Sequence, residues 1–222
     1  MRPLPTETTR GDMERRLIIF DFDGTLADTF TWLIGISDQI ADKHGFRRIE
    51  RSHIDAMRSL DARQILAHQG ISLRKLPFIA RDIFALMEAD IASIALFPGI
   101  EAILRALSER GARLAIVSSN SKPNVLRILG PELAARFDYI ECGTPLFGKK
   151  YRLKRLLAHS KTPPHAAILI GDEVRDAQAA IATGIPFGAV AWGYSHIDSL
   201  KSHGAHEVFT HVDDLFRKLV AC

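Results

Sequence analysis

The amino-acid sequence predicts an α/β fold, in which a parallel sheet is flanked by helices and an all-helical segment is inserted after the first strand. Three observations lead to this class. An apolar run near the N-terminus is typical of a buried strand. Beyond Gly99, apolar runs alternate with helical patterns, and such alternation forms parallel sheets covered on both faces. Between these regions, roughly 65 residues show only helical periodicity.

The chain is expected to divide into a core and a helical cap domain. The core should comprise residues 16–29 and 97–222, and the cap domain residues 30–96. Residues 1–15 are polar and contain two prolines, so we expect a flexible tail, in which Met13 is an alternative start.

The individual elements follow from caps, breakers and periodicity. Asp28 and Asp61 are expected to cap two helices, which Gly45 and Gly70 should end. In the cap domain we expect helices at about residues 29–44, 52–60, 61–68 and 76–94. In the core we expect strands at residues 17–20, 114–117, 139–140, 167–170, 187–191 and 207–209. The core helices are expected at about residues 100–110, 122–129, 151–159, 174–183 and 213–220.

The composition is that of a soluble globular protein, with 47% hydrophobic and 25% charged residues. The net charge of +3 comes from scattered basic pairs, which argues against nucleic-acid binding. Cys142 and Cys222 are the only cysteines, which indicates a reducing cytoplasm and no disulfide framework. No apolar run approaches the ~18 residues of a membrane span, so we expect a cytoplasmic protein without a membrane partner.

Two carboxylates follow the first expected strand directly. Asp21 and Asp23 are two residues apart, so their side chains point the same way in extended backbone. Like charges repel and buried charge is costly, and a cation beside the pair would offset both effects. Mg²⁺ prefers hard oxygen ligands of this kind, and Gly24 lets backbone come close to a ligand. The segment therefore indicates a magnesium site.

Polar side chains also follow the later strands. They are Ser118, Ser119 and Asn120 after the second strand, Lys149 and Lys150 at a loop-to-helix start, and Asp172, Glu173 and Asp176 after the fourth strand. The carboxyl ends of parallel strands share one edge of a sheet, so these groups should converge. Carboxylates suit Mg²⁺, whereas hydroxyl, lysine and free N–H groups suit a phosphate.

With these residues the chain resembles the haloacid dehalogenase superfamily, in its phosphatase branch near the phosphoglycolate-phosphatase-like group. The resemblance covers about residues 17–220. The four signatures occur in order as Asp21-x-Asp23-Gly-Thr-Leu, Ser118, Lys149 and Gly-Asp172-x-x-x-Asp176. The first is highly specific, and the serine and lysine signatures are weak alone. The resemblance implies a Rossmann-like core, a helical cap over the site and Mg²⁺-dependent hydrolysis of phosphomonoesters.

The resemblance also implies a role for each signature carboxylate. Asp21 would attack phosphorus and form an aspartyl-phosphate. Asp23 would protonate the leaving oxygen and then take a proton from the hydrolytic water. Asp21 and Asp172 would supply carboxylate ligands to Mg²⁺, and Asp23 its backbone carbonyl. Asp176 would orient Lys149 or a metal-bound water without binding the metal itself.

The other signatures would bind the phosphate group. Ser118 would hydrogen-bond a phosphate oxygen, together with the N–H groups of Gly24 and Ser119. Lys149 would neutralise developing negative charge. In the cap domain, Arg58 is the candidate to meet an anionic substrate tail, and Arg63 and Lys75 are further candidates.

Several assignments stay open at the level of sequence. Lys150 adjoins Lys149, and only the helical phase favours Lys149. Glu173 could replace Asp176 as the extra carboxylate. Asn120 stands where many relatives have lysine, and it is either a phosphate contact or a helix cap.

The expected substrate is a small phosphorylated metabolite, with 2-phosphoglycolate favoured by the resemblance alone, and both a monomer and a homodimer fit. The alternatives are a phosphomutase or other phosphotransferase of the same superfamily, and a non-catalytic phosphate-binding module. A dehalogenase is disfavoured, because it has no need for the acid/base role of Asp23. A receiver domain is disfavoured because its acceptor ends a middle strand, whereas Asp21 ends the first.

Overall fold

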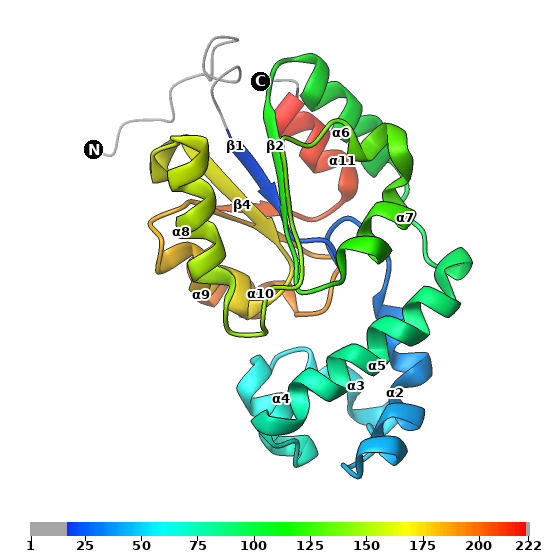
Figure 1. The fold of residues 1–222 in the computed structure, drawn as a ribbon. Coiled ribbons are helices and arrows are strands. Elements are labelled where there is room, and N and C mark those ends of the chain that lie inside the picture. Colours follow the sequence, from blue (N-terminus) through cyan, green and yellow to red (C-terminus); the bar gives the residue numbers. More distant parts are fainter. Residues whose placement is uncertain (1–16, 221–222) are drawn as a thin grey trace.

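The computed structural model describes residues 17–220, and the expected tail at residues 1–15 lies outside them. Its centre is a six-stranded sheet in the order β3-β2-β1-β4-β5-β6, in which every neighbouring pair is parallel (Figure 1). The strands are β1 (Leu17–Phe20), β2 (Arg113–Val117), β3 (Tyr139–Glu141), β4 (Ala167–Gly171), β5 (Phe187–Val190) and β6 (Glu207–Phe209). The predicted α/β class and its parallel sheet are confirmed.

Helices flank the sheet and make up the segment inserted after β1. In the core they are α6 (Ile100–Glu109), α7 (Lys122–Ala134), α8 (Lys149–Ser160), α9 (Val174–Ile181), α10 (Ile197–Ser202) and α11 (Val212–Leu215), with the 3₁₀ turn η4 (Pro164–Ala166) and the π-helical segment η5 (Phe216–Val220). In the insertion (residues 30–96) they are α2 (Phe30–His44), α3 (Ile54–Met57), α4 (Ala62–Gln69) and α5 (Leu76–Ala89), with the turns η1 (Arg51–His53), η2 (Leu73–Lys75) and η3 (Ile91–Ser93). Among the helices of residues 17–220, none combines the length and apolar character that crossing a membrane requires.

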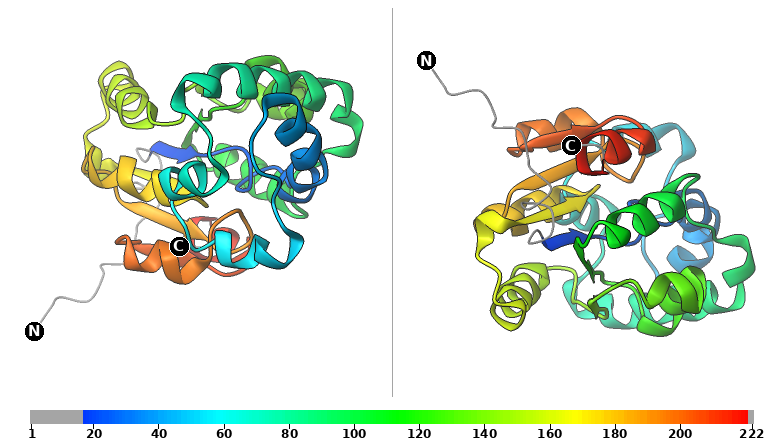
Figure 2. Two further views of the ribbon diagram at one scale, coloured as in Figure 1. Left: turned by 90° about the horizontal axis from the view of Figure 1, so that it is seen from below. Right: turned by 90° about the horizontal axis from the view of Figure 1, so that it is seen from above.

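Alternate side chains of each strand pack against opposite layers of helices. Ile18 and Phe20 of β1 belong to one cluster, which includes apolar residues of α6, α7 and α11. Leu17 and Ile19 belong to a second cluster, with α8, α9 and α10. The two layers lie on either side of the sheet in Figures 1 and 2. Burial on both faces explains why the strand is apolar throughout, with no polar alternation.

The insertion lies beyond the carboxyl ends of the strands, in the direction of the β1 arrow in Figure 1. The two segments that join it to the core pair with each other. The Asp28 N–H donates to the Ala95 carbonyl, and the Phe97 N–H donates to the Leu26 carbonyl, both at 2.9 Å. The chain therefore leaves and re-enters the core at one place, over the edge where the polar strand ends gather. The division into a core of residues 16–29 and 97–222 and a cap domain of residues 30–96 remains a prediction.

The structure differs from the expected elements at a few places. Thr29, not Asp28, is the N-cap of α2, and its side chain makes no capping hydrogen bond. The helix expected to reach residue 94 ends at Ala89, after which the chain tightens into η3. Helix α10 is an addition, because six residues are too short to show a period. By contrast, Asp61 caps α4 in a full capping box, as expected.

Candidate active site

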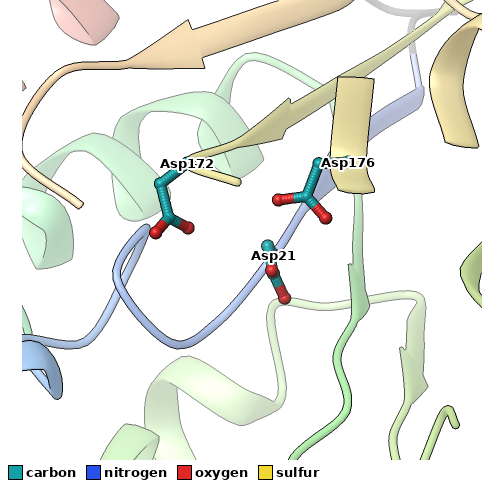
Figure 3. Close-up of side chains that lie close together, drawn as sticks. All are labelled: Asp21, Asp172 and Asp176. Carbon is teal, nitrogen blue, oxygen red and sulfur yellow. The ribbon is translucent and has the colours of Figure 1, made fainter. Parts of the chain in front are cut away.

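The site lies where the sheet changes direction. Strand order runs outward from β1 to β3 on one side and from β4 to β6 on the other, which makes the carboxyl ends of β1 and β4 the topological switch point. Asp21 follows β1 directly, and Asp172 follows β4 directly. Asp176 lies in the first turn of α9. Figure 3 shows the three carboxylates gathered at this point.

These three carboxylates form a buried cluster. One oxygen from each of Asp21, Asp172 and Asp176 lies within 4.8 Å of the other two. Asp21 Oδ1 accepts a hydrogen bond from the Phe22 N–H at 2.8 Å, whereas Oδ2 accepts none from the residues that the structure describes. Burial raises the pKa of Asp21 to about 7, although the charge of Lys149 opposes the shift. Burial likewise raises the pKa of Asp172 well above its ordinary value. The raised pKa values show that burial disfavours the ionised forms of Asp21 and Asp172, even with cationic side chains nearby.

Two short hydrogen bonds fix the Asp172 carboxylate, and two glycines approach it closely. Thr25 Oγ1 donates to its Oδ1 at 2.6 Å, and the Tyr194 N–H donates to its Oδ2 at 2.7 Å. A Cβ on Gly24 would lie 2.2 Å from Asp172 Oδ2, and a Cβ on Gly193 would lie 2.2 Å from Asp172 Cβ. Both positions therefore require glycine, and Gly24 also has a φ of +73°. The glycine of the first signature makes room for Asp172.

Lys149, and not Lys150, enters the carboxylate cluster. Lys149 Nζ donates to Asp176 Oδ1 at 2.5 Å and lies 2.8 Å from Asp21 Oδ2 as an ion pair. Its side chain is buried, whereas Lys150 is exposed and lies over the ring of Tyr151. Burial alone would lower the pKa of Lys149, but Asp176 and Asp21 raise it above its ordinary value. The geometry thus gives Lys149 a permanent positive charge beside Asp21.

Asp176 has both oxygens engaged. Oδ1 accepts from Lys149, and Oδ2 accepts from the Glu173 N–H at 3.1 Å. Burial by itself would raise the pKa of Asp176, yet the charges of Lys149 and Arg175 hold it below its ordinary value. Asp176 thus holds Lys149 by a hydrogen bond, and its role in ordering Lys149 during a reaction stays a prediction.

Asp23 is linked to the second strand and to the insertion through Asn120. Asn120 Nδ2 donates to Asp23 Oδ1 at 2.9 Å and also lies 3.1 Å from Met87 Sδ in α5. Burial raises the pKa of Asp23 to about 6, and the Asn120 hydrogen bond opposes the shift. Asn120 is therefore a partner of Asp23, and the N-cap of α7 is Ser121 instead. A contact between Asn120 and phosphate stays a prediction.

The predicted phosphate ligands lie near the same edge. Strand β2 pairs with β1, and Ser118 follows β2 directly; its Oγ accepts from the Asn120 N–H at 3.0 Å. Ser119 is half-buried in the same turn. The Gly24 N–H donates to the Ala27 carbonyl at 2.9 Å, so it is used within its own turn. The contacts of Ser118, Ser119 and Gly24 with phosphate remain predictions.

The sequence did not single out Arg175, which is a second, half-buried cation at the site. Its Nε donates to Glu173 Oε1 at 2.9 Å, its Nη2 also bonds Glu173, and Nη2 lies 3.9 Å from Asp21 Oδ2. Glu173 is thus paired with Arg175 and is the N-cap of α9, while Asp176 takes the position beside Lys149. The sequence offered one signal for Arg175, which is its position between Asp172 and Asp176 inside the fourth signature.

Arg58 of the insertion is bound to the loop after β5. Its Nε donates to the Tyr194 carbonyl at 3.1 Å, and its Nη2 donates to the Gly193 carbonyl at 3.0 Å. The Arg58 carbonyl in turn accepts from the His196 N–H at 2.9 Å. This loop also holds Asp172, so Arg58 connects the insertion to the carboxylate cluster. A contact of Arg58 with substrate remains a prediction.

The two further cationic candidates lie apart from this loop. The Arg63 guanidinium lies 4.9 Å from the ring centroid of Phe147, and Lys75 Nζ donates to the His44 carbonyl at 2.6 Å. Neither Arg63 nor Lys75 lines the cavity described next.

A cavity of about 140 Å³ separates the insertion from the core. Helices α2, α3 and α4 supply most of its lining, and the turn from β4 to α9 supplies Glu173, Val174 and Arg175. Arg175 thus lies between the cavity and Asp21. The arrangement offers a charged centre for a phosphate next to a separate space for the group that carries it.

Comparisons with known proteins agree with the signatures. Residues 18–190 match the model of the family of haloacid dehalogenase-like hydrolases. The phosphoglycolate phosphatase of Synechococcus elongatus is 32% identical over 184 residues, which cover 82% of this chain and 87% of that protein. The tyrosine-protein kinase PtkA of Mycobacterium tuberculosis is 26% identical over 192 residues, which cover 82% of this chain and 64% of that protein.

Solved structures share the fold. A hydrolase of the haloacid dehalogenase-like family from Streptococcus pneumoniae superposes with a TM-score of 0.75 at 22% identity, and the match covers 92% of this chain and 98% of that one. CbbY from Rhodobacter sphaeroides, solved in complex with phosphate, gives a TM-score of 0.68 at 23% identity over 87% of this chain and 93% of that one. The extent of the family match and the identity to the first relative lead to one conclusion. The chain belongs to the haloacid dehalogenase-like hydrolases, in their phosphoglycolate-phosphatase-like branch.

Proposed function

We propose that the protein is a Mg²⁺-dependent phosphomonoesterase that acts through an aspartyl-phosphate on Asp21. The observation that carries the proposal is the placement of Asp21 and Asp172 on adjacent strand ends with Lys149 beside them. A nucleophilic carboxylate, a place for a metal ion and a fixed cation are the parts that phosphoryl transfer needs.

The carboxylate cluster fits a divalent cation. Its oxygen donors are of the kind that Mg²⁺ prefers, and one carboxylate oxygen from each of Asp21, Asp172 and Asp176 lies within 4.8 Å of the other two. Asp21, Asp172 and the backbone carbonyl of Asp23 would hold the ion, while Asp176 stays with Lys149. When bound, Mg²⁺ would supply the positive charge that lets an anionic phosphate approach an anionic nucleophile.

The chemical steps use Asp21 and Asp23. A carboxylate oxygen of Asp21 bonds to phosphorus as the ester P–O bond breaks, and the leaving oxygen takes the proton of Asp23. A water molecule then bonds to phosphorus, returns a proton to Asp23 and releases the Asp21 carboxylate with inorganic phosphate. A pKa of about 6 for Asp23 suits both transfers near neutral pH.

The remaining residues would orient the phosphate and its charge. Lys149 would neutralise negative charge on the transferring group, because its own pKa is held high by Asp176 and Asp21. Ser118 and the N–H of Ser119 would bond phosphate oxygens from the β2 side. Asn120 would keep Asp23 aligned through the bond already described.

The substrate is proposed to be a small phosphorylated metabolite in the cytoplasm, the compartment that the cysteine content predicts. The relatives named phosphoglycolate phosphatase make 2-phosphoglycolate the first compound to assay. The chain is also similar to a protein-tyrosine kinase, so a phosphotransferase is the alternative. Phosphatases and phosphotransferases both transfer a phosphoryl group and differ in the acceptor.

Phosphate release tests this proposal. We would assay a panel of phosphomonoesters that includes 2-phosphoglycolate, with Mg²⁺ and with EDTA. We expect metal-dependent release of inorganic phosphate from at least one ester. Folded protein that releases no phosphate from any ester with Mg²⁺ present would contradict the proposal.

A further inference from the structure

We propose that the cavity between the insertion and the core binds the organic part of the substrate, and that this part is uncharged and apolar, about the size of a phenyl ring. The inference rests on the proposed function, which leaves the alcohol of the phosphomonoester open. It differs from the compound that the names of the relatives suggest, because the carbon part of 2-phosphoglycolate is a short carboxylate.

The lining of the cavity is mostly hydrocarbon. Apolar side chains reach it from three helices of the insertion, among them Phe30, Leu33, Ile34, Ile54, Met57 and Ile65. They are half-buried or buried, so an occupant would complete an existing apolar surface. An apolar surface of this kind binds apolar groups, and it does not compensate a carboxylate for the loss of its hydration.

The charged residues of the lining are balanced and already paired. There are two cations and two carboxylates, Arg58, Arg175, Asp61 and Glu173. Arg58 donates to two backbone carbonyls, and Arg175 donates twice to Glu173. The two positive and two negative charges of the lining cancel, so the lining carries no net charge that would attract a substrate carboxylate. The electrostatics therefore favour an uncharged occupant.

The position and size of the cavity fit such a group. Arg175 lines the cavity and also lies 3.9 Å from Asp21, so a phosphate at Asp21 would place its ester group toward this space. The volume of about 140 Å³ is close to the roughly 150 Å³ of an apolar cavity known to accept benzene. A phenyl or a branched alkyl group would fill it, and a methyl group would leave most of it empty.

Substrates that share one reaction test the inference. We expect kcat/KM for benzyl phosphate to exceed that for 2-phosphoglycolate and for methyl phosphate by about tenfold or more, because the three alcohols are similarly poor leaving groups and each buried methylene contributes severalfold. An equal or higher value for 2-phosphoglycolate would overturn the inference while supporting the proposed function.

A matched pair of variants on α2 locates the effect. Leu33 lines the cavity, whereas Ile36 is a half-buried apolar residue of the same helix that does not. Leu33→Ala should lower kcat/KM for benzyl phosphate about tenfold and leave that for methyl phosphate unchanged, and Ile36→Ala should change neither. Equal effects of the two variants, or equal losses with both substrates, would overturn the inference.

Binding without turnover separates the two proposals. Calorimetry with phenylphosphonate and methylphosphonate needs no catalysis. If no ester is hydrolysed but phenylphosphonate binds about tenfold tighter, and Leu33→Ala removes that advantage, the cavity assignment stands and the proposed hydrolase activity fails. If neither turnover nor binding distinguishes the phenyl compounds, the cavity assignment is wrong.

Discussion

The carboxylate cluster and the cavity are neighbouring halves of one site, but they are built from different material. The cluster comes entirely from the core, where strand ends carry buried charges that a few hydrogen bonds fix in place. The cavity is lined largely by the insertion, whose helices offer apolar side chains. Under the proposed function, the core would supply the reaction and the insertion would select the molecule that undergoes it.

Removal of the nucleophile should have the largest effect. Asp21→Asn keeps the shape of the side chain but cannot form the aspartyl-phosphate, so we expect kcat to fall by at least about 10³-fold. Circular dichroism and thermal unfolding should show an intact fold. A variant that retained activity would remove Asp21 as nucleophile and separate the reaction from the cluster.

The two adjacent lysines offer a control inside the chain. Lys149→Ala should lower kcat by about 10²–10³-fold, because it removes a buried cation next to Asp21. Lys150→Ala should leave kcat within about twofold, since Lys150 is exposed. A larger loss in Lys150→Ala than in Lys149→Ala would overturn this part of the account.

The link between the two halves can be tested at Arg58. Arg58→Ala removes two hydrogen bonds to the loop that seats Asp172, so we expect Mg²⁺ to bind about tenfold more weakly. Calorimetric titration with Mg²⁺ measures this without turnover, and Arg63→Ala serves as the control, because Arg63 lies against the ring of Phe147 instead of the loop that holds Asp172. Unchanged Mg²⁺ affinity would show that the insertion does not support the metal site.

The sequence predicted the cluster well because strand ends are local features. An apolar run followed directly by Asp21 or Asp172 places those side chains at the sheet edge without any knowledge of tertiary contacts. The helical phase favoured Lys149 but left Lys150 open, and the structure places Lys149 in the cluster.

Other parts of the site could not be predicted in the same way. Arg175 looks like a solvated residue in the first turn of a helix, and only its pairing with Glu173 places it inside. The loop at Tyr194 carries no signature, although the Tyr194 N–H donates a hydrogen bond to the Asp172 carboxylate. The cavity could not be recognised in the sequence, because apolar residues that line it, such as Leu33, have the same helical spacing as those that pack into a core.

The smallest expected effect is on stability. Burial raises the pKa of Asp21 to about 7 and that of Asp23 to about 6, so without metal the folded state binds these protons more tightly than the unfolded state. This stabilisation is complete below about pH 4 and is lost as the pH rises through 6 and 7. The melting temperature of EDTA-treated protein should therefore fall by roughly 5 °C between pH 5 and pH 8.

Mg²⁺ should reverse that loss. The ion competes with protons for the same carboxylates, so added Mg²⁺ should raise the melting temperature more at pH 8 than at pH 5. Asp21→Asn should flatten the pH dependence of the metal-free protein. A melting temperature that rises with pH over this range in the metal-free protein would contradict the assigned pKa directions.

The central claim is that Asp21 carries the phosphoryl group during turnover. The most direct measurement is a rapid acid quench of the Mg²⁺-loaded protein with ³²P-labelled benzyl phosphate or 2-phosphoglycolate, followed by peptide mapping. The account predicts acid-stable label on the peptide that contains Asp21, and none in Asp21→Asn. Phosphate release by the protein with no label on that peptide, or with label on another residue, would contradict it.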